Sequence, residues 1–447
     1  DSELGEMRSV VWSWCESLGE IFSADPASAT QDPTARRAAV DALGAAFETY
    51  RRGMRTEHEV QSIATESLLG LLSNMESWLA STIRAGQRED GTYDGYNLVR
   101  FSESQAEVSR LPLMLEGQVA VLSSGVLDAE ASAKLLDALF ASTLYRADHD
   151  TFLLYPIKFI EDFLSKGKVD VQKSSLLQQL VQADNRQLVV KDHAGVVRFA
   201  PDLVNRRGVM GILDQLGQNE RWSKLVEQDR EHVVNLYESV FDHHAFTGRS
   251  GGMYGYEGIG CTYWHMVAKL LVAAGECVQN AQDAPAEVQE RLHALYHRVR
   301  DGLGFRRTPH QFGAYPIDAY SHTPGDRGAQ QPGMTGQVKE ELLTRRMELG
   351  VRFIQGEIHF KPILMRGDEW PEQSQENHML QLAAGEVFFQ LCSISVIYAK
   401  GPSPKIEVHT AEGVTEISGA KLPKNWSSHL FARDGVIQSL RVTLGAK

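Results

Sequence analysis

A carboxylate among aromatic residues is the first feature of this sequence that could do chemistry. The glycine-rich stretch RSGGMYGYEGIGCTYWH, residues 249–265, contains Glu257 as its one acidic residue. Near it stand four residues whose side chains could contact a ligand: Arg249, Tyr254, Tyr256 and Trp264. Glycines let a backbone approach a ligand closely, and aromatic faces stack on the apolar faces of sugar rings. The stretch therefore predicts a sugar-binding loop with Glu257 as a catalytic carboxylate.

Other kinds of site could use the same stretch. A phosphate-binding P-loop needs a lysine where Cys261 stands. A dinucleotide-binding turn must follow a strand, whereas the preceding residues have a helical pattern. A nucleophile at Ser250 would likewise need a strand-to-helix turn. The sequence disfavours all three, and the remaining alternative is structural, with Glu257 only complementing the dipole of the following helix.

A second polar stretch lies some sixty residues further on, from Ala314 to Glu341. It is too long and too polar for a plain connector. Its candidate substrate-binding residues carry hydroxyl, imidazole and amide groups that hydrogen-bond sugar hydroxyls: Tyr315, Tyr320, His322, Gln330, Gln331 and Thr335. Asp318 or Glu340 is the candidate for a second catalytic carboxylate. Alternatively, Glu340 and its neighbour Glu341 are solvated helix residues.

Two further clusters are weaker. The helix-ending segment 86–103 adds Tyr93 and Tyr96 as candidate substrate-binding residues. Residues 148–150 (DHD) and 242–244 (DHH) contain groups that bind metals, but neither cluster has the ligand spacing of a zinc site. The sequence predicts neither a metal nor another cofactor.

Helical periodicity dominates the chain up to about residue 350. Apolar residues recur at intervals of three and four in about eleven segments: Val10–Phe22, Ala38–Met54, Val60–Ile83, Glu107–Ser123, Ala129–Leu144, Ser174–Ala183, Gly208–Leu216, Trp222–Phe241, Thr262–Cys277, Ala286–Leu303 and Thr335–Leu349. Asp128 is the predicted N-cap of one of them. Residues Gln187–Ala200 predict a hairpin around Asp192–Gly195.

After residue 350 the apolar period changes to two. Short strands, residues 429–432 among them, are predicted to alternate with turns, including turns at Gln355–Gly356 and Arg433–Gly435. The predicted fold is mainly α: an (α/α)6 toroid of helical hairpins over residues 1–350, followed by a C-terminal antiparallel β-sandwich over residues 351–447. An open α-solenoid or an irregular helical bundle is the alternative. A solenoid should show a fixed-period repeat, which the sequence lacks.

The composition and charge of the chain limit the kinds of molecule that it is expected to bind. The chain has 447 residues and a formal net charge of -13, with acidic and basic residues mixed. This balance disfavours nucleic acid or an anionic membrane surface as a partner. The four cysteines are widely separated and form no CxxC pair, which disfavours a disulfide framework and slightly favours the cytoplasm. Asp1 in place of methionine fits a processed chain or a piece of a longer one.

The combination of helical hairpins, long aromatic and acidic loops and a terminal β-sandwich resembles the (α/α)6 carbohydrate-active enzymes. These include glucoamylase-like and trehalase-like inverting glycosidases and inverting disaccharide phosphorylases. The resemblance covers most of the chain as architecture. Phosphorylases of this type bind phosphate with His, Gln and a Thr-Gly pair, and His322, Gln330 or Gln331, and Thr335–Gly336 are similar in kind.

The resulting functional prediction is an enzyme that cleaves a glycosidic bond of a glucan-type oligo- or polysaccharide, with inversion. An inverting hydrolase needs a carboxylic acid and an opposing carboxylate base; Glu257 is the predicted acid, and Asp318 or Glu340 the base. The first alternative is a phosphorylase, in which phosphate replaces the base and its water. The others are a polysaccharide lyase, using Tyr320 and His322 with Arg249 or Arg327, and a non-catalytic glycan-binding or scaffold module.

Overall fold

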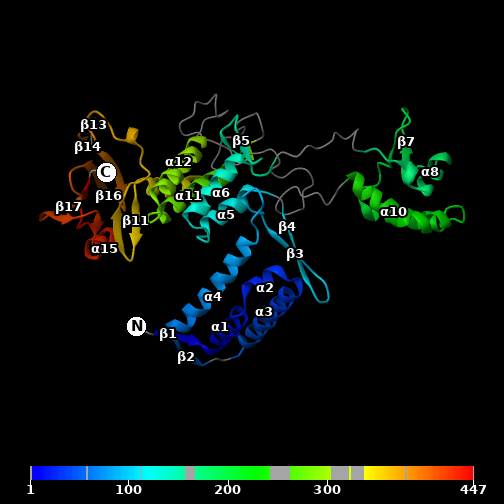
Figure 1. Ribbon diagram of the computed structural model, residues 1–447, viewed down its shortest axis with the longest axis horizontal. Helices are drawn as coiled ribbons and strands as arrows, with labels where there is room; N and C mark the ends of the chain where they lie inside the picture. Colours follow the sequence, from blue (N-terminus) through cyan, green and yellow to red (C-terminus); the bar gives the residue numbers. More distant parts are fainter. Residues whose placement is uncertain are drawn as a thin grey trace. The chain divides into compact units, whose positions relative to one another are not determined.

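The structure is a computed structural model of the chain (Figure 1). It describes residues 3–56, 59–111, 113–156, 167–241, 262–303, 322–323, 337–377 and 380–445. The chain divides into two compact units. Unit 1 comprises Asp1–Phe152 and Thr262–Lys447, and unit 2, Leu153–Cys261, is inserted between these two segments. Among the described helices, none is long and apolar enough to span a membrane.

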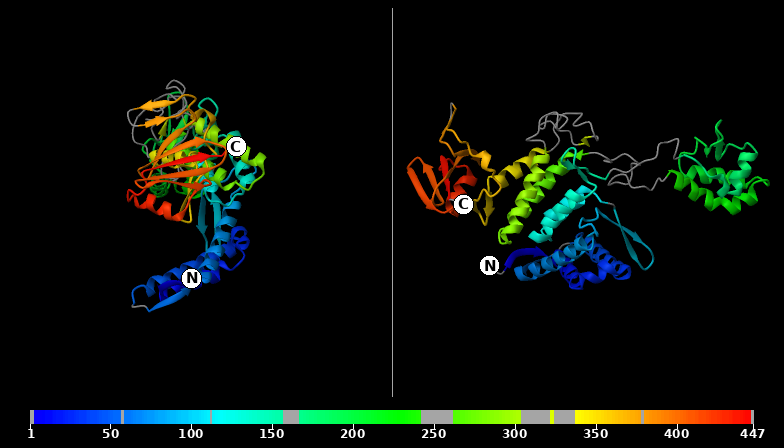
Figure 2. Two further views of the ribbon diagram at one scale, coloured as in Figure 1. Left: turned by 90° about the vertical axis from the view of Figure 1, so that its left-hand side faces the viewer. Right: turned by 45° about the horizontal axis from the view of Figure 1, so that its top comes forward.

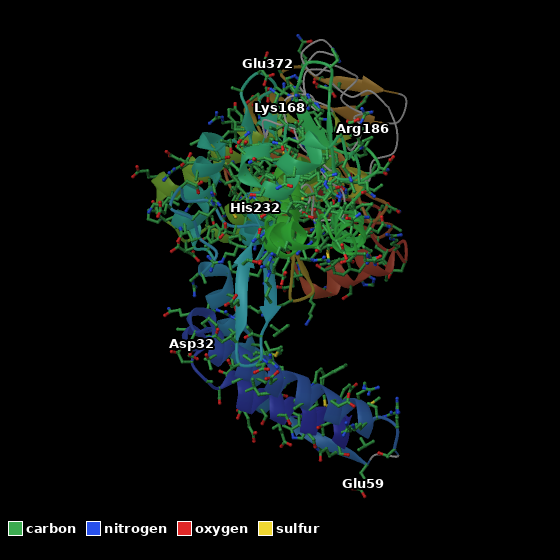
Figure 3. The ribbon with its side chains drawn as sticks, turned by 90° about the vertical axis from the view of Figure 1, so that its right-hand side faces the viewer. Asp32, Glu59, Lys168, Arg186, His232 and Glu372 are labelled. Carbon is green, nitrogen blue, oxygen red and sulfur yellow. The ribbon has the colours of Figure 1, made fainter. Side chains whose placement is uncertain are left out.

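The first part of unit 1 is a group of four helices that pack on one another. They are α1 (Ser9–Phe22), α2 (Pro26–Gln31), α3 (Pro33–Gly53) and α4 (Thr65–Arg84), accompanied by the antiparallel pair of β1 (Glu3–Arg8) and β2 (Val60–Ala64). Asp25 caps α2 and Asp32, labelled in Figure 3, caps α3; a proline follows each as the first helical residue. The predicted helix Val60–Ile83 thus begins as a strand, because Val60–Ala64 pairs with a distant segment.

A second group of helices forms the middle of unit 1. It comprises α5 (Leu115–Ser123), α6 (Ala129–Ala141), α11 (Trp264–Asn280), α12 (Ala286–Gly302) and α14 (Gln337–Glu348). Helix α11 contacts the other four (Figure 1) and is apolar on most of its surface, as expected for a central helix. Asp128 caps α6 as predicted, accepting a hydrogen bond from the N–H of Ala131 at 2.8 Å. The described helices do not confirm the predicted toroid.

Three short strand pairs flank these helices: β3 (Asn97–Phe101) with β4 (Ala106–Arg110), β5 (Tyr145–Arg146) with β6 (Thr151–Phe152), and β9 (Thr262–Tyr263) with β10 (His322–Thr323). The prediction of a helix over the whole of Glu107–Ser123 was wrong in its first part. Residues 106–110 are extended because they pair with Asn97–Phe101, and the helix begins only at Leu115.

The last part of unit 1 is mostly β-structure. A three-stranded sheet has the order β11 (Val351–Ile354), β12 (Glu357–Phe360), β19 (Lys421–Leu422). A five-stranded sheet (Figure 2) has the order β15 (Val387–Leu391), β16 (Ile394–Lys400), β20 (Ser439–Leu444), β17 (Lys405–Thr410), β18 (Gly413–Ser418). A separate pair joins β13 (Gln375–Asn377) to β14 (Leu380–Leu382). One hydrophobic core contains side chains from both larger sheets.

Two features depart from a purely antiparallel sandwich. Strands β16 and β20 are parallel, because the chain between them, through β17, β18 and β19, is long enough for a parallel return. Residues 429–432, predicted as extended, belong to helix α15 (Lys424–Ala432), whose Leu430 is buried in the shared core. The predicted turns are present, with positive φ at Gln355, Gly356 and Arg433.

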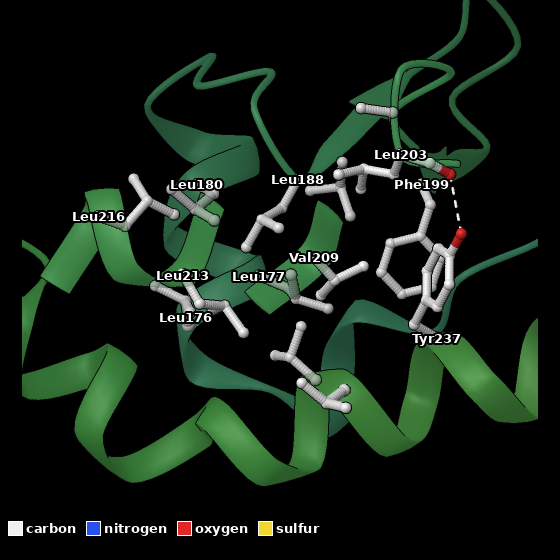
Figure 4. Close-up of a cluster of buried hydrophobic side chains, with 14 of the residues drawn as sticks. Leu176, Leu177, Leu180, Leu188, Phe199, Leu203, Val209, Leu213, Leu216 and Tyr237 are labelled. Atoms are coloured by element: carbon white, nitrogen blue, oxygen red, sulfur yellow. Dashed lines mark hydrogen bonds between the residues drawn. The ribbon is translucent and has the colours of Figure 1, made fainter. Parts of the chain in front are cut away.

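Unit 2 has its own hydrophobic core (Figure 4). Its elements are the short η1 (Val171–Lys173), α8 (Ser175–Gln182), the predicted hairpin of β7 (Val189–Lys191) and β8 (Val197–Phe199), α9 (Arg206–Gly217) and α10 (Ser223–Phe241). Asp229 of α10 joins two elements, since it accepts hydrogen bonds from the hydroxyl of Ser174 at 2.7 Å and the N–H of Leu176 at 2.8 Å. This segment falls within the range predicted as one helical domain, residues 1–350.

Candidate functional site

The polar stretches identified in the sequence lead into three helices of unit 1. Residues 86–103 precede α5, residues 249–265 lead into α11, and residues 314–341 lead into α14. Helix α11 packs against both α5 and α14. In addition, β9 pairs with β10, which sets His322 opposite Tyr263. The three helices that follow these stretches in the sequence therefore pack together, and the described residues at their starts include Glu116, His265 and Glu340.

Glu340 lies in the first turn of α14 and is almost fully buried, with 2% of its side chain exposed. Its Oε1 lies 3.1 Å from Nε2 of His265, in the first turn of α11, and 3.3 Å from Nζ of Lys339. Burial opposes ionisation of Glu340, but the hydrogen bond with His265 outweighs it with the help of the backbone and Lys339, so the pKa of Glu340 falls below its ordinary value. Glu340 is therefore a carboxylate at neutral pH.

A second carboxylate lies near the same place. Glu116, in the first turn of α5, accepts a hydrogen bond from the hydroxyl of Tyr96 at 2.8 Å. Burial raises the pKa of Tyr263, and the charges of Glu116 and Glu340 raise it further. The ring of Tyr263 also meets His265 edge to face, with centroids 5.9 Å apart. Glu116, Tyr263, His265 and Glu340 thus form one cluster, here called the tyrosine–carboxylate cluster.

Sequence reasoning named Glu340 and Tyr96 but missed Glu116 and His265. An acidic residue in the first turn of a helix is ordinarily explained by the helix dipole, so Glu116 gave no distinct signal. His265 stood at the end of the glycine-rich stretch, directly after the aromatic pair Tyr263–Trp264. Its partner Glu340 is remote in sequence, and only packing of α11 on α14 joins them.

Two other predicted substrate-binding residues lie in the core. Trp264, the first residue of α11, and Tyr93 are both buried. The backbone of Tyr93 is held by the side-chain amide of Gln118, which accepts from its N–H at 2.8 Å and donates to its carbonyl at 2.6 Å. Tyr96 is exposed. Substrate contact by these three residues stays a prediction.

The remaining predicted site residues lie outside the described part of the chain: Arg249, Tyr254, Tyr256, Glu257, Tyr315, Asp318, Tyr320, Gln330, Gln331 and Thr335. For His322 the structure gives only the strand position. Arg327 and residues 242–244 are also outside it. The roles assigned to these residues remain predictions.

The described residues contain no group of three histidine, cysteine, aspartate or glutamate side chains that could hold a metal ion. In the segment 148–150, both carboxylates have other partners. Asp148 pairs with Arg146, and Asp150 accepts a hydrogen bond from the hydroxyl of Tyr145 at 2.6 Å. The candidate chemistry of the described cluster is therefore that of carboxylates, phenols and an imidazole.

Comparison with known families adds one finding. Residues 160–244 match GH149 phosphorylase insertion domain 2. The matched segment falls within unit 2, Leu153–Cys261. No curated protein matches the chain. The match supports a relationship to glycoside phosphorylases, and with it the prediction of a carbohydrate-active enzyme, hydrolase or phosphorylase, is confirmed.

Proposed function

We propose that the protein is an inverting glycoside phosphorylase rather than a hydrolase. The observation that carries this proposal is the match of residues 160–244 to an insertion domain of a phosphorylase family. The coincidence of that match with a unit that has its own core supports its reading as an inserted domain. The residues outside the matched segment would then carry the catalytic site, including Glu257, which lies between the end of the match at residue 244 and the start of α11. We propose the (α/α)6 toroid as the complete architecture of that part of the chain.

The tyrosine–carboxylate cluster supports a sugar-binding site. Carboxylates and phenolic hydroxyls are strong partners for sugar hydroxyls, and charged acceptors form the shorter and stronger hydrogen bonds. Two carboxylates, Glu116 and Glu340, act on one tyrosine within a partly buried setting. An anionic ligand such as phosphate would be repelled by this pair, so phosphate should bind next to the cluster rather than in it.

The start of α14 is the proposed phosphate site. Thr335–Gly336 immediately precede this helix, whose first residue is Gln337. Unpaired N–H groups and the positive end of the dipole make a helix N-terminus favourable for an anion. The pairing of β9 with β10 places the backbone of His322 beside Tyr263. Thr335–Gly336 directly precede α14 in the sequence, and both they and His322 are similar in kind to the phosphate-binding residues of such phosphorylases.

In the proposed reaction, a phosphate oxygen forms a bond to the anomeric carbon as the glycosidic C–O bond breaks on the opposite face. The leaving oxygen takes the proton of Glu257, which is the proposed general acid. Because phosphate is itself the nucleophile, no carboxylate base is required. Asp318 is then available to bind sugar hydroxyls, and Glu340 is considered below.

The test is to incubate the protein with glucan oligosaccharides with and without inorganic phosphate. We expect sugar 1-phosphate, detected by ³¹P NMR, only when phosphate is present, and Glu257→Gln should reduce kcat at least about 100-fold. Glu372→Gln, an exposed position (Figure 3), is the matched control and should keep full activity. Release of reducing sugar without phosphate would establish a hydrolase instead, and absorbance near 235 nm in a parallel incubation with uronate-containing polysaccharides would establish a lyase.

A further inference from the structure

One oxygen of Glu340 lacks a hydrogen-bond partner although it is buried. Oε1 of this carboxylate contacts His265 and Lys339, but Oε2 has no partner in the described structure. Among the described residues, Oε2 of Glu340 is the one carboxylate oxygen in this condition. A buried polar atom without a partner is destabilising by about 1–3 kcal/mol, and by more when it is charged. Oε2 of Glu340 can therefore accept a hydrogen bond from a donor that the described residues do not supply.

The chemistry of the surroundings narrows what that donor can be. An anion is disfavoured, because Glu340 and Glu116 both place negative charge near Tyr263. A metal ion would need further ligands, and no group of three ligating side chains is present in the described part of the chain. A neutral hydroxyl donor meets the demand without burying another charge. The side chain of His265, which contacts the other oxygen Oε1, is 22% exposed, so the tyrosine–carboxylate cluster reaches the protein surface.

We propose that Oε2 of Glu340 accepts a hydrogen bond from one hydroxyl of the sugar substrate and selects sugars that carry it. This inference rests on the proposed function for its ligand class. His265 is a positioning residue: its Nε2 holds Oε1, which fixes the carboxylate so that Oε2 stays available. Glu340 is then a specificity-determining residue and not the base that hydrolysis would require.

The contribution of this hydrogen bond can be measured by removing the sugar hydroxyl in one experiment and replacing Glu340 in another. Hydrogen bonds to charged groups contribute about 1.5–3 kcal/mol, equivalent to about 10- to 150-fold in affinity. The probes are gluco-, manno- and galacto-configured mono- and disaccharides with their monodeoxy analogues. Binding is measured by isothermal titration calorimetry without phosphate, so that a phosphorylase binds but does not turn over.

The wild-type protein should bind one monodeoxy analogue about 10- to 150-fold more weakly than its parent sugar. Glu340→Gln should bind the parent sugar more weakly than the wild type and should distinguish the two less, because a neutral amide oxygen accepts a weaker hydrogen bond than a carboxylate. Glu372→Gln, an exposed glutamate (Figure 3), should keep the discrimination of the wild type. Unchanged discrimination in Glu340→Gln, or no binding of any sugar in the panel, would overturn the proposal.

Two substitutions of His265 keep the test decisive if Glu340→Gln does not fold. His265→Gln supplies an amide donor near the position of Nε2 and should retain the discrimination, whereas His265→Leu removes the donor and should reduce it. Equal behaviour of the two variants contradicts the positioning role. His232→Gln, at an exposed site in α10 (Figure 3), is the matched control. If the discrimination is found but no sugar phosphate ever forms, the inference stands and the phosphorylase proposal fails.

Discussion

Replacing Arg300 by methionine should destabilise unit 1 by about 3 kcal/mol. The guanidinium of Arg300, only 10% exposed, lies between two carboxylates of α14. It donates to Glu341 with both terminal nitrogens, at 2.9 and 2.7 Å, and its Nε lies 3.1 Å from Oε1 of Glu348. Glu348 is 6% exposed and also accepts from the hydroxyl of Tyr296 at 2.9 Å and from Arg345 at 3.0 Å.

The expected loss of stability is the sum of what Glu348 and Glu341 each lose when the guanidinium of Arg300 is removed. Removing one member of a buried ion pair usually costs about 3–5 kcal/mol, because a buried charge is left uncompensated. Glu348 retains two of its three partners after Arg300→Met, so its share should be lower, about 2–3 kcal/mol. Glu341 is half-exposed and should contribute less than about 1 kcal/mol. A second substitution, Glu348→Gln, removes the uncompensated charge and should restore about 1–2 kcal/mol.

The assay is urea unfolding followed by circular dichroism, with the transitions of the two units fitted separately. The control is Arg186→Met in unit 2 (Figure 3), because Arg186 is 73% exposed and solvent screens its pair with Asp184. If Arg300→Met changes stability no more than Arg186→Met, the reasoning from burial fails. It fails equally if Glu348→Gln adds its own destabilisation to that of Arg300→Met instead of relieving it.

Three further predictions concern single positions. Burial lowers the pKa of His297 to about 4. His297 therefore stabilises the folded state above pH 6.5, and this contribution, about 1–2 kcal/mol after allowance for screening, is lost as the pH falls towards 4. In urea titrations, the stability of His297→Gln should depend less on pH in this window than that of the wild type, and an equal dependence would contradict the reasoning. The hydroxyl of the buried Tyr237 donates to a backbone carbonyl at 2.8 Å (Figure 4), so Tyr237→Phe should destabilise unit 2 by about 1–2 kcal/mol in thermal unfolding, with no change expected in the transition of unit 1. Gly350 has φ +67° and a Cβ there would overlap the carbonyl of Lys361, so Gly350→Ala should lower stability by about 2–4 kcal/mol, whereas Gly19→Ala, a helical position with open space, should be neutral or stabilising.

Local sequence determined much of the secondary structure. The apolar spacing of α11 and α12 and the Asp128 cap of α6 were sufficient to predict these helices to within a few residues. The hairpin turn at Gln355–Gly356 was equally readable. Each of these features depends on residues close together in the chain, so their side chains and backbone preferences are visible in a short window.

Long-range pairing decided what the sequence did not predict. Residues 106–110 became a strand because residues 97–101 lie beside them, although their apolar spacing also suited a helix. The division of the chain into two units was not predicted, because both units contain helices with the same period and differ only in which core they share.

The candidate site likewise combines features that the local sequence predicts with features that only long-range packing determines. The sequence identified the polar stretches and named Glu340, since residue type and loop character are local properties. It did not reveal that Glu340 is buried, that His265 holds one of its oxygens, or that Glu116 acts on the same tyrosine. These relations join α5, α11 and α14, which are far apart in the chain, and arise only when their helix ends are packed together. Burial and partners set the charge of a carboxylate and its capacity for further hydrogen bonds, so only the tertiary structure decided that Glu340 is a buried carboxylate with one oxygen free of a protein partner.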